Sequence, residues 1–120
     1  MAKYRAVFVE ESAEHIAEIG RALLELEKKP DRSEAIDVIF RMAHSIKGMA
    51  ASLEYESITR AAHRLEDQMQ IVRSAGRVSP GSELSELFEH LAELEIMIGV
   101  VRDTGASPND DSLKKKTCNP

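Results

Sequence analysis

The helical spacing of apolar residues, which occurs in four segments of the chain, restricts the fold more than any other feature of the sequence. Apolar residues recur at steps of three and four over about residues 4–28, 34–52, 58–75 and 80–103, as they do in amphipathic α-helices. No segment shows the two-residue alternation of a β-strand. Four helices joined by short connections predict an all-α domain, an antiparallel up-down four-helix bundle.

The apolar stripe of each expected helix defines the expected core. Ser12 interrupts the first stripe and is its weak point. The stripe residues expected to be buried are Phe8, Ile16, Ile19, Leu23, Leu26, Ile36, Ile39, Phe40, Ala43, Ile46, Ala50, Ile58, Ala61, Ala62, Leu65, Met69, Val72, Leu84, Leu87, Phe88, Leu91, Leu94, Ile98 and Val101.

Proline, glycine and hydroxyl residues mark the expected helix ends. Pro30 should end the first helix and Gly76 the third. Ser57 is a candidate N-cap of the third helix. Ser79 followed by Pro80 should begin the fourth helix, because proline is favoured at the first helical position.

The composition changes at about residue 103, which divides the chain into two parts. We expect the bundle to occupy residues 1–103. Residues 104–120 combine Gly, Ser, Pro and Asp with a run of three lysines, which is typical of a flexible linker or tail. A short extra C-terminal helix near Ser112 is a weaker alternative.

Charge and cysteine content exclude several functional classes. The net charge is -5 and the expected bundle has no basic stripe, which argues against nucleic acid and anionic membranes as partners. No apolar run approaches the roughly 18 residues of a membrane span, so membrane insertion is not expected. Cys118 is the single cysteine, so no disulfide framework forms within the chain and a cytoplasmic location is expected.

Polar residues of the second and third helices are predicted to meet at one site. The short connection near Glu54 makes these helices antiparallel, which brings His44 to the height of Glu66. His44 lies eight residues after Ile36, and Glu66 lies eight residues after Ile58, so each is rotated by about 80° from its apolar stripe in the same sense. We therefore expect His44 and Glu66 to be neighbours on a solvent-facing groove.

This arrangement suits a nucleophilic histidine. A carboxylate that accepts the proton of one ring nitrogen fixes the tautomer and leaves the lone pair of the other nitrogen free. That nitrogen could attack phosphorus, with Lys47 and His63 offsetting the charge of the phosphoryl group. The chain has neither a Gly-rich phosphate loop leading to Lys-Ser/Thr nor a metal-holding acidic cluster, so it could carry a phosphoryl group but not take one from ATP unaided.

The segment 40–50, Phe-Arg-Met-Ala-His-Ser-Ile-Lys-Gly-Met-Ala, closely resembles the phosphorylation-site helix of histidine phosphotransfer (HPt) domains. The greatest resemblance is to the N-terminal domain of CheA-type chemotaxis histidine kinases, and it covers roughly residues 1–103. His44, Lys47 and Gly48 match the His-x-x-Lys-Gly motif, and His63 and Glu66 match the His and Glu of the next helix. The segment 54–55 departs from the family, because members usually carry Gly-Phe or Gly-Leu where this chain has Glu-Tyr.

The resemblance implies a role in a two-component system. His44 would receive a phosphoryl group from a kinase catalytic domain, in the same or another chain, and pass it to an aspartate of a response-regulator receiver domain. ATP and Mg²⁺ would be used by the kinase domain, and no cofactor is expected in this chain. The chain looks like part of a histidine protein kinase, while Gly48, Met49 and Ser45 would contribute to partner docking.

Simpler interpretations compete with this one. A single histidine beside an apolar stripe is more often a half-buried, hydrogen-bonded residue, and Gly48 could serve close packing. A passive helical adaptor or dimerisation module would need no special histidine. A metal enzyme in a four-helix bundle would use Glu-x-x-His motifs, and the residues three before each histidine are Ser12, Arg41, Arg60 and Leu87, so no metal site is expected.

Overall fold

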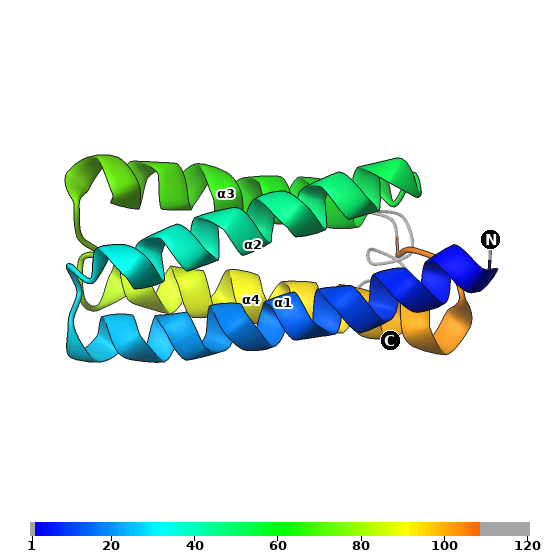
Figure 1. Cartoon of the computed structure of the whole chain (residues 1–120), viewed down its shortest axis with the longest axis horizontal. Coiled ribbons are helices and arrows are strands. Elements are labelled where there is room, and N and C mark those ends of the chain that lie inside the picture. Colours follow the sequence, from blue (N-terminus) through cyan, green and yellow to red (C-terminus); the bar gives the residue numbers. More distant parts are fainter. Residues whose placement is uncertain (1, 109–120) are drawn as a thin grey trace, which may run out of the picture.

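The computed structural model describes residues 2–108, and four α-helices account for most of them. Their bounds are Ala2–Lys28 (α1), Ser33–Ser52 (α2), Glu56–Ala75 (α3) and Ser82–Thr104 (α4). The helices lie side by side along the long axis, and no strand occurs within residues 2–108 (Figure 1). Each helix packs against the one before and the one after it, and α1 also packs against α4. The predicted all-α up-down bundle is confirmed.

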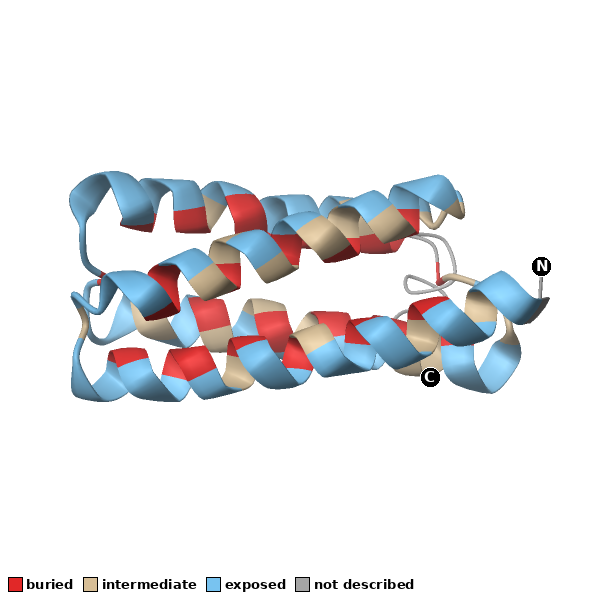
Figure 2. Cartoon of the chain, viewed as in Figure 1, coloured by how far each residue is buried: buried red, intermediate tan, exposed pale blue. Residues whose placement is uncertain are grey.

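The inner face of every helix carries the core (Figure 2). Most of the predicted stripe residues are buried, but Phe40, Leu84 and Phe88 are only partly buried and pack on the edge of the core. Ala22, Ala35, Val78 and Met97 are buried as well, which the stripes did not predict. Ser12 is fully buried, and its hydroxyl has no hydrogen-bond partner among the described residues, which makes it a weak point in the core.

Two of the predicted helix starts are wrong. Helix α3 begins at Glu56, and Ser57 is buried in its first turn instead of capping it. Helix α4 begins at Ser82 rather than at Pro80. The reason lies in the connection, because Gly81 has a non-helical backbone, with φ 96° and ψ -117°, so the helix can start only after it.

A residue with left-handed backbone conformation follows the helix in two of the connections. Gly76 ends α3 with φ 80°, as predicted for a C-terminal glycine. Glu54 follows α2 with φ 61°, so this position keeps a backbone conformation typical of glycine although it holds a glutamate. The next residue, Tyr55, packs edge-on against Phe8 of α1 with ring centroids 5.1 Å apart. The α2–α3 turn is therefore held against the bundle.

Helix α4 ends at Thr104, close to the predicted boundary of the bundle at residue 103. Pro108 is buried and is the last residue that the structure describes. The predicted tail beyond it, including the alternative helix near Ser112, lies outside the described residues.

Candidate functional site

His44 stands on the outer side of α2, beside the seam with α3. Its ring is well exposed, since 65% of the side-chain surface is open to solvent. The helix around it is fixed by residues of the inner face, and Ala43 and Ile46 on either side of His44 are fully buried. The histidine is thus an exposed group on a rigid helix, which is the arrangement that a reactive side chain requires.

Glu66 of α3 lies directly across the seam and holds two side chains of α2. Its Oε2 is 2.5 Å from Nδ1 of His44, and its Oε1 accepts a hydrogen bond of 2.6 Å from Nζ of Lys47. Glu66 is also largely buried, with 8% of its surface exposed. The pairing of His44 with Glu66, expected from helical rotation and height, is present in the structure.

The charge of Glu66 is stabilised by these partners. Burial by itself would raise the pKa of its carboxyl. The hydrogen bonds from Lys47 and His44, together with the electrostatic attraction of these two side chains, outweigh burial and leave that pKa below its usual value. Glu66 is therefore a carboxylate at neutral pH and acts only as a hydrogen-bond acceptor.

The ionised carboxylate determines which nitrogen of His44 carries a proton. Because Glu66 can only accept, Nδ1 of His44 must donate to it. In the neutral ring Nε2 then keeps its lone pair. Since the ring is exposed, Nε2 is available to a partner from solvent, and the site can act as a nucleophile toward phosphorus.

Lys47 and His63, the two residues expected to offset phosphoryl charge, have different partners in the structure. The ammonium group of Lys47 reaches across the seam to Glu66. His63 lies outside this hydrogen-bonded set, with Nε2 3.3 Å from Oδ1 of Asp67 one turn further along α3. Sequence reasoning missed both partners. The four-residue spacing of His63 and Asp67 was a usable signal, whereas Lys47 required the side-chain packing to be known.

The three predicted docking residues occupy different surroundings. Gly48 is exposed one turn after His44, and a Cβ added to it would have nothing within 4 Å. Close packing therefore does not explain this glycine. Met49 is partly buried against the core, and Ser45 is half-buried. Of the three, Gly48 offers the freest access beside His44.

Within residues 2–108, no cluster of three or more His, Cys, Asp or Glu side chains is arranged to bind a metal ion. No helix in this part of the chain has the length and apolar character needed to cross a membrane.

Fold and site together define a class of protein, a helical bundle that presents one carboxylate-oriented histidine to solvent. The chain belongs to the Hpt domain family, whose sequence model matches residues 3–104. Among its relatives, chemotaxis protein CheA of Bacillus subtilis is 36% identical over 112 residues, and CheA of Halobacterium salinarum is 33% identical over 110. These matches cover 93% and 92% of this chain but only 17% and 16% of the two relatives.

Solved structures give the same result. The CheA phosphotransferase domain from Thermotoga maritima matches with a TM-score of 0.75 at 30% identity, over 82% of this chain and 94% of that domain. The phosphorylated P1 domain of CheA3 from R. sphaeroides, solved in complex with CheY6, has a TM-score of 0.81. It is 23% identical, over 98% of each chain, and shows a shared fold. The predicted resemblance to the HPt domains of CheA-type kinases is confirmed.

The lowered pKa of Glu66 predicts how the stability of the bundle depends on pH. A carboxyl whose pKa is lower in the folded than in the unfolded protein stabilises the folded state. This stabilisation is present at pH values above the unfolded pKa, 4.5, and is lost as the pH falls through the lower pKa of the folded state. At pH 7, Glu66→Gln should therefore lower the free energy of unfolding, and the difference from wild type should shrink below about pH 4.5. Urea unfolding at several pH values measures this.

A matched control separates this effect from simple loss of charge. Glu93→Gln removes a carboxylate that pairs with Arg64 at the surface. Its effect at pH 7 should be the smaller of the two, because exposed ion pairs contribute little. A difference between Glu66→Gln and wild type that stays constant from pH 7 to pH 3 would contradict the prediction.

Proposed function

We propose that this chain is the phosphoacceptor and phosphotransfer module of a CheA-like chemotaxis two-component system. His44 receives a phosphoryl group from an ATP-dependent kinase domain, in the same or another chain, and passes it to an aspartate of a response regulator. The observation that carries the proposal is the hydrogen bond between Nδ1 of exposed His44 and buried Glu66. Family membership, the CheA relatives and the solved P1–CheY6 complex support it.

The first transfer uses the free nitrogen of His44. Nε2 attacks the γ-phosphorus of ATP held by the kinase domain, an N–P bond forms, and the bond from phosphorus to the leaving ADP oxygen breaks. The ring keeps the Nδ1 proton and becomes positively charged. Glu66, already hydrogen-bonded to that proton, stabilises the developing charge without having to move.

The second transfer reverses the chemistry at nitrogen. A carboxylate oxygen of the regulator aspartate attacks phosphorus, the N–P bond breaks, and its electron pair returns to Nε2. His44 is then neutral again with its proton still on Nδ1. No cofactor is needed in this chain for either step, because ATP and Mg²⁺ belong to the kinase domain.

Two nearby side chains, Lys47 and His63, are proposed to balance the phosphoryl charge. Lys47 lies one turn after His44 on α2, and its ammonium group donates a hydrogen bond to Glu66. His63 lies on α3, three residues before Glu66, with its side chain 56% exposed. Either side chain can turn toward the phosphoryl oxygens when His44 is modified.

Location and activity follow from this role. A module that draws on ATP and on a response regulator works in the cytoplasm, and neither nucleic acid nor a membrane takes part. The chain supplies the phosphoacceptor, while phosphoryl transfer from ATP is catalysed by the kinase domain. A passive adaptor or dimerisation module remains the alternative function, and phosphate uptake distinguishes the two.

Loss of phosphate uptake in His44→Gln is the direct test. The chain, incubated with a CheA-type kinase catalytic domain and ATP, should gain one phosphoryl group that is labile in acid and stable in alkali, as measured by intact-mass spectrometry. His44→Gln should gain none. Uptake by His44→Gln would refute the site, and no uptake by wild type with several such kinases would favour the adaptor.

Glu66→Gln tests the orienting role. The glutamine side chain can still occupy the position but carries no charge, so it neither fixes the donor at Nδ1 of His44 nor stabilises the charged ring. We expect phosphorylation of His44 to slow by roughly tenfold to a hundredfold, as when other carboxylates that orient a histidine are replaced. Initial rates with the kinase domain measure this, with circular dichroism to verify the fold. An unchanged rate would contradict the role.

Gly48→Ala tests whether the bare backbone serves partner access. Alanine should raise the free energy of unfolding by about 1 kcal/mol, since glycine is unfavourable within a helix and the site has room for a methyl group. A partner that approaches the backbone here should nevertheless accept or donate phosphate more slowly. A more stable variant with unchanged transfer rates would remove Gly48 from the docking surface.

A further inference from the structure

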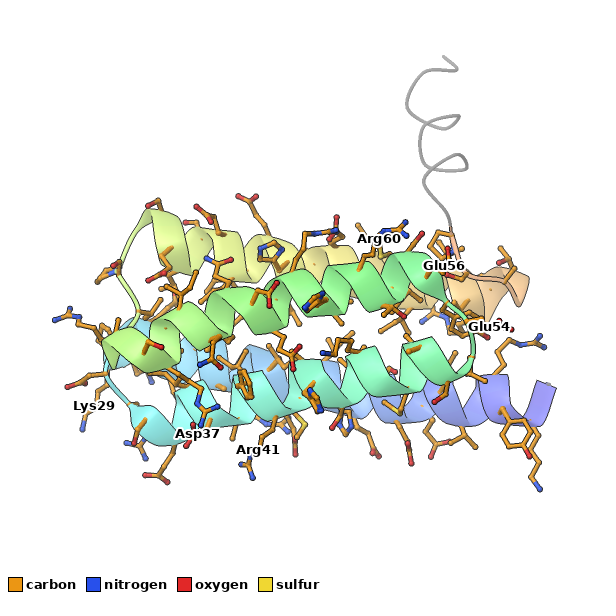
Figure 3. The ribbon with its side chains drawn as sticks, turned by 90° about the horizontal axis from the view of Figure 1, so that it is seen from above. Lys29, Asp37, Arg41, Glu54, Glu56 and Arg60 are labelled. Carbon is orange, nitrogen blue, oxygen red and sulfur yellow. The ribbon has the colours of Figure 1, made fainter. Side chains whose placement is uncertain are left out.

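A second polar cluster lies on the α2–α3 seam, and the mechanism above does not use it. The guanidinium of Arg73 stacks on the ring of Phe40, with Cζ 4.5 Å from the ring centroid. Its Nε is 3.3 Å from Oδ1 of Asp37. Together with Arg41, these side chains line a hollow of about 320 Å³. Asp37 and Arg41 lie on successive turns of α2 (Figure 3).

This hollow is on the same flank of the molecule as the phosphoacceptor. Asp37, Phe40, His44 and Lys47 follow one another at steps of three and four along α2, and each of them contacts a residue of α3. Phe40 precedes His44 by one turn, about 6 Å along the helix axis. A protein that covers the His44 ring can therefore reach the hollow at the same time.

Arg73 is prepared to bind an anion. The contact with the Phe40 ring restrains the guanidinium, which has five N–H donors in a fork that matches a carboxylate. The contact with Asp37 engages Nε, and the Arg73 side chain is 43% exposed. An exposed ion pair of this kind contributes little free energy, so an incoming carboxylate can take the place of Asp37.

The charge of the hollow favours an acidic partner. Two guanidinium groups, from Arg41 and Arg73, face one carboxylate, whereas the whole chain carries a net charge of -5. A regulator that accepts phosphate on an aspartate brings a carboxylate to His44 before transfer. Acidic side chains beside that aspartate would meet the positive part of this surface.

We propose that the hollow formed by Asp37, Phe40, Arg41 and Arg73 binds an acidic side chain of the receiver domain during transfer from His44. Arg73 is the main contact, and Phe40 keeps its guanidinium in place. This inference rests on the proposed function. It adds a specificity-determining surface for the second transfer and assigns no part of that surface to the first.

The chain offers a matched control for the experiment. Arg64 is 51% exposed and pairs with Glu93 across the other seam of α3, toward α4. Arg64→Gln and Arg73→Gln thus each remove one charge and one exposed helix–helix ion pair. Only Arg73 lies on the His44 flank.

Transfer from phosphorylated His44 is measured with the CheY-type receiver domain that accepts phosphate fastest from wild type in a panel. We expect Arg73→Gln to slow transfer at limiting receiver by about fivefold and to reduce its dependence on salt. Arg64→Gln should transfer at the wild-type rate, and Arg73→Lys should fall between Arg73→Gln and wild type. Phosphorylation of His44 by the kinase domain should be the same in all four proteins.

Each other result would overturn the inference. Slower phosphorylation of His44 with unchanged transfer would assign the hollow to the kinase domain. Equal transfer rates of Arg73→Gln and Arg64→Gln would show that Arg73 only links α2 to α3. Its loss would then change the free energy of unfolding in urea but not phosphotransfer. If wild-type His44 takes up no phosphate, the proposed function fails first. If it takes up phosphate and transfers equally in every variant, only the hollow is refuted.

Discussion

The carboxylate of Glu66 is buried at the α2–α3 seam, and a buried charge is tolerated only when other groups compensate it. Lys47 and His44 supply that compensation from the facing helix. The same contact bridges the two helices, sets the tautomer of His44 and engages Lys47. Structure and reactivity are thus linked at one acceptor group, and a change at Glu66 must affect both.

The packing around the Glu66 contact holds the two helices that form it in place. Small residues such as Ala43, Ala50, Ala61 and Ala62 are buried on α2 and α3, so the helices that carry the site approach each other on small side chains. The connection between them is short and ends in the left-handed conformation of Glu54. Rigid packing on the inside leaves the reactive ring free on the outside, which keeps the cost of orienting it low at the moment of reaction.

The α2–α3 seam contains polar contacts at two heights, one centred on the buried carboxylate of Glu66 and the other on an exposed ion pair. At one height Glu66 joins His44 and Lys47, and at the other Arg73 joins Asp37 while stacking on Phe40. The Arg73–Asp37 pair does not need to contribute much to stability, because both side chains are exposed and the apolar faces of four helices already form the core. Polar groups on this flank are therefore free to be selected for partner recognition, whereas a similar pair on the α3–α4 seam, Arg64 and Glu93, is remote from the histidine.

Much of this protein could be read from its sequence. The three-to-four-residue period determined the helices and the bundle, and equal offsets from Ile36 and Ile58 brought His44 to Glu66, because helix rotation is fixed by residue number. Helix starts were less predictable, since Ser57 is buried within the first turn of α3 and the non-helical backbone of Gly81 delays α4 until Ser82. The tertiary structure alone decided that Lys47 binds Glu66, that Gly48 borders open space and that Arg73 stacks on Phe40. Long side chains choose among several partners within reach, and that choice depends on the packing of both helices rather than on the period of either.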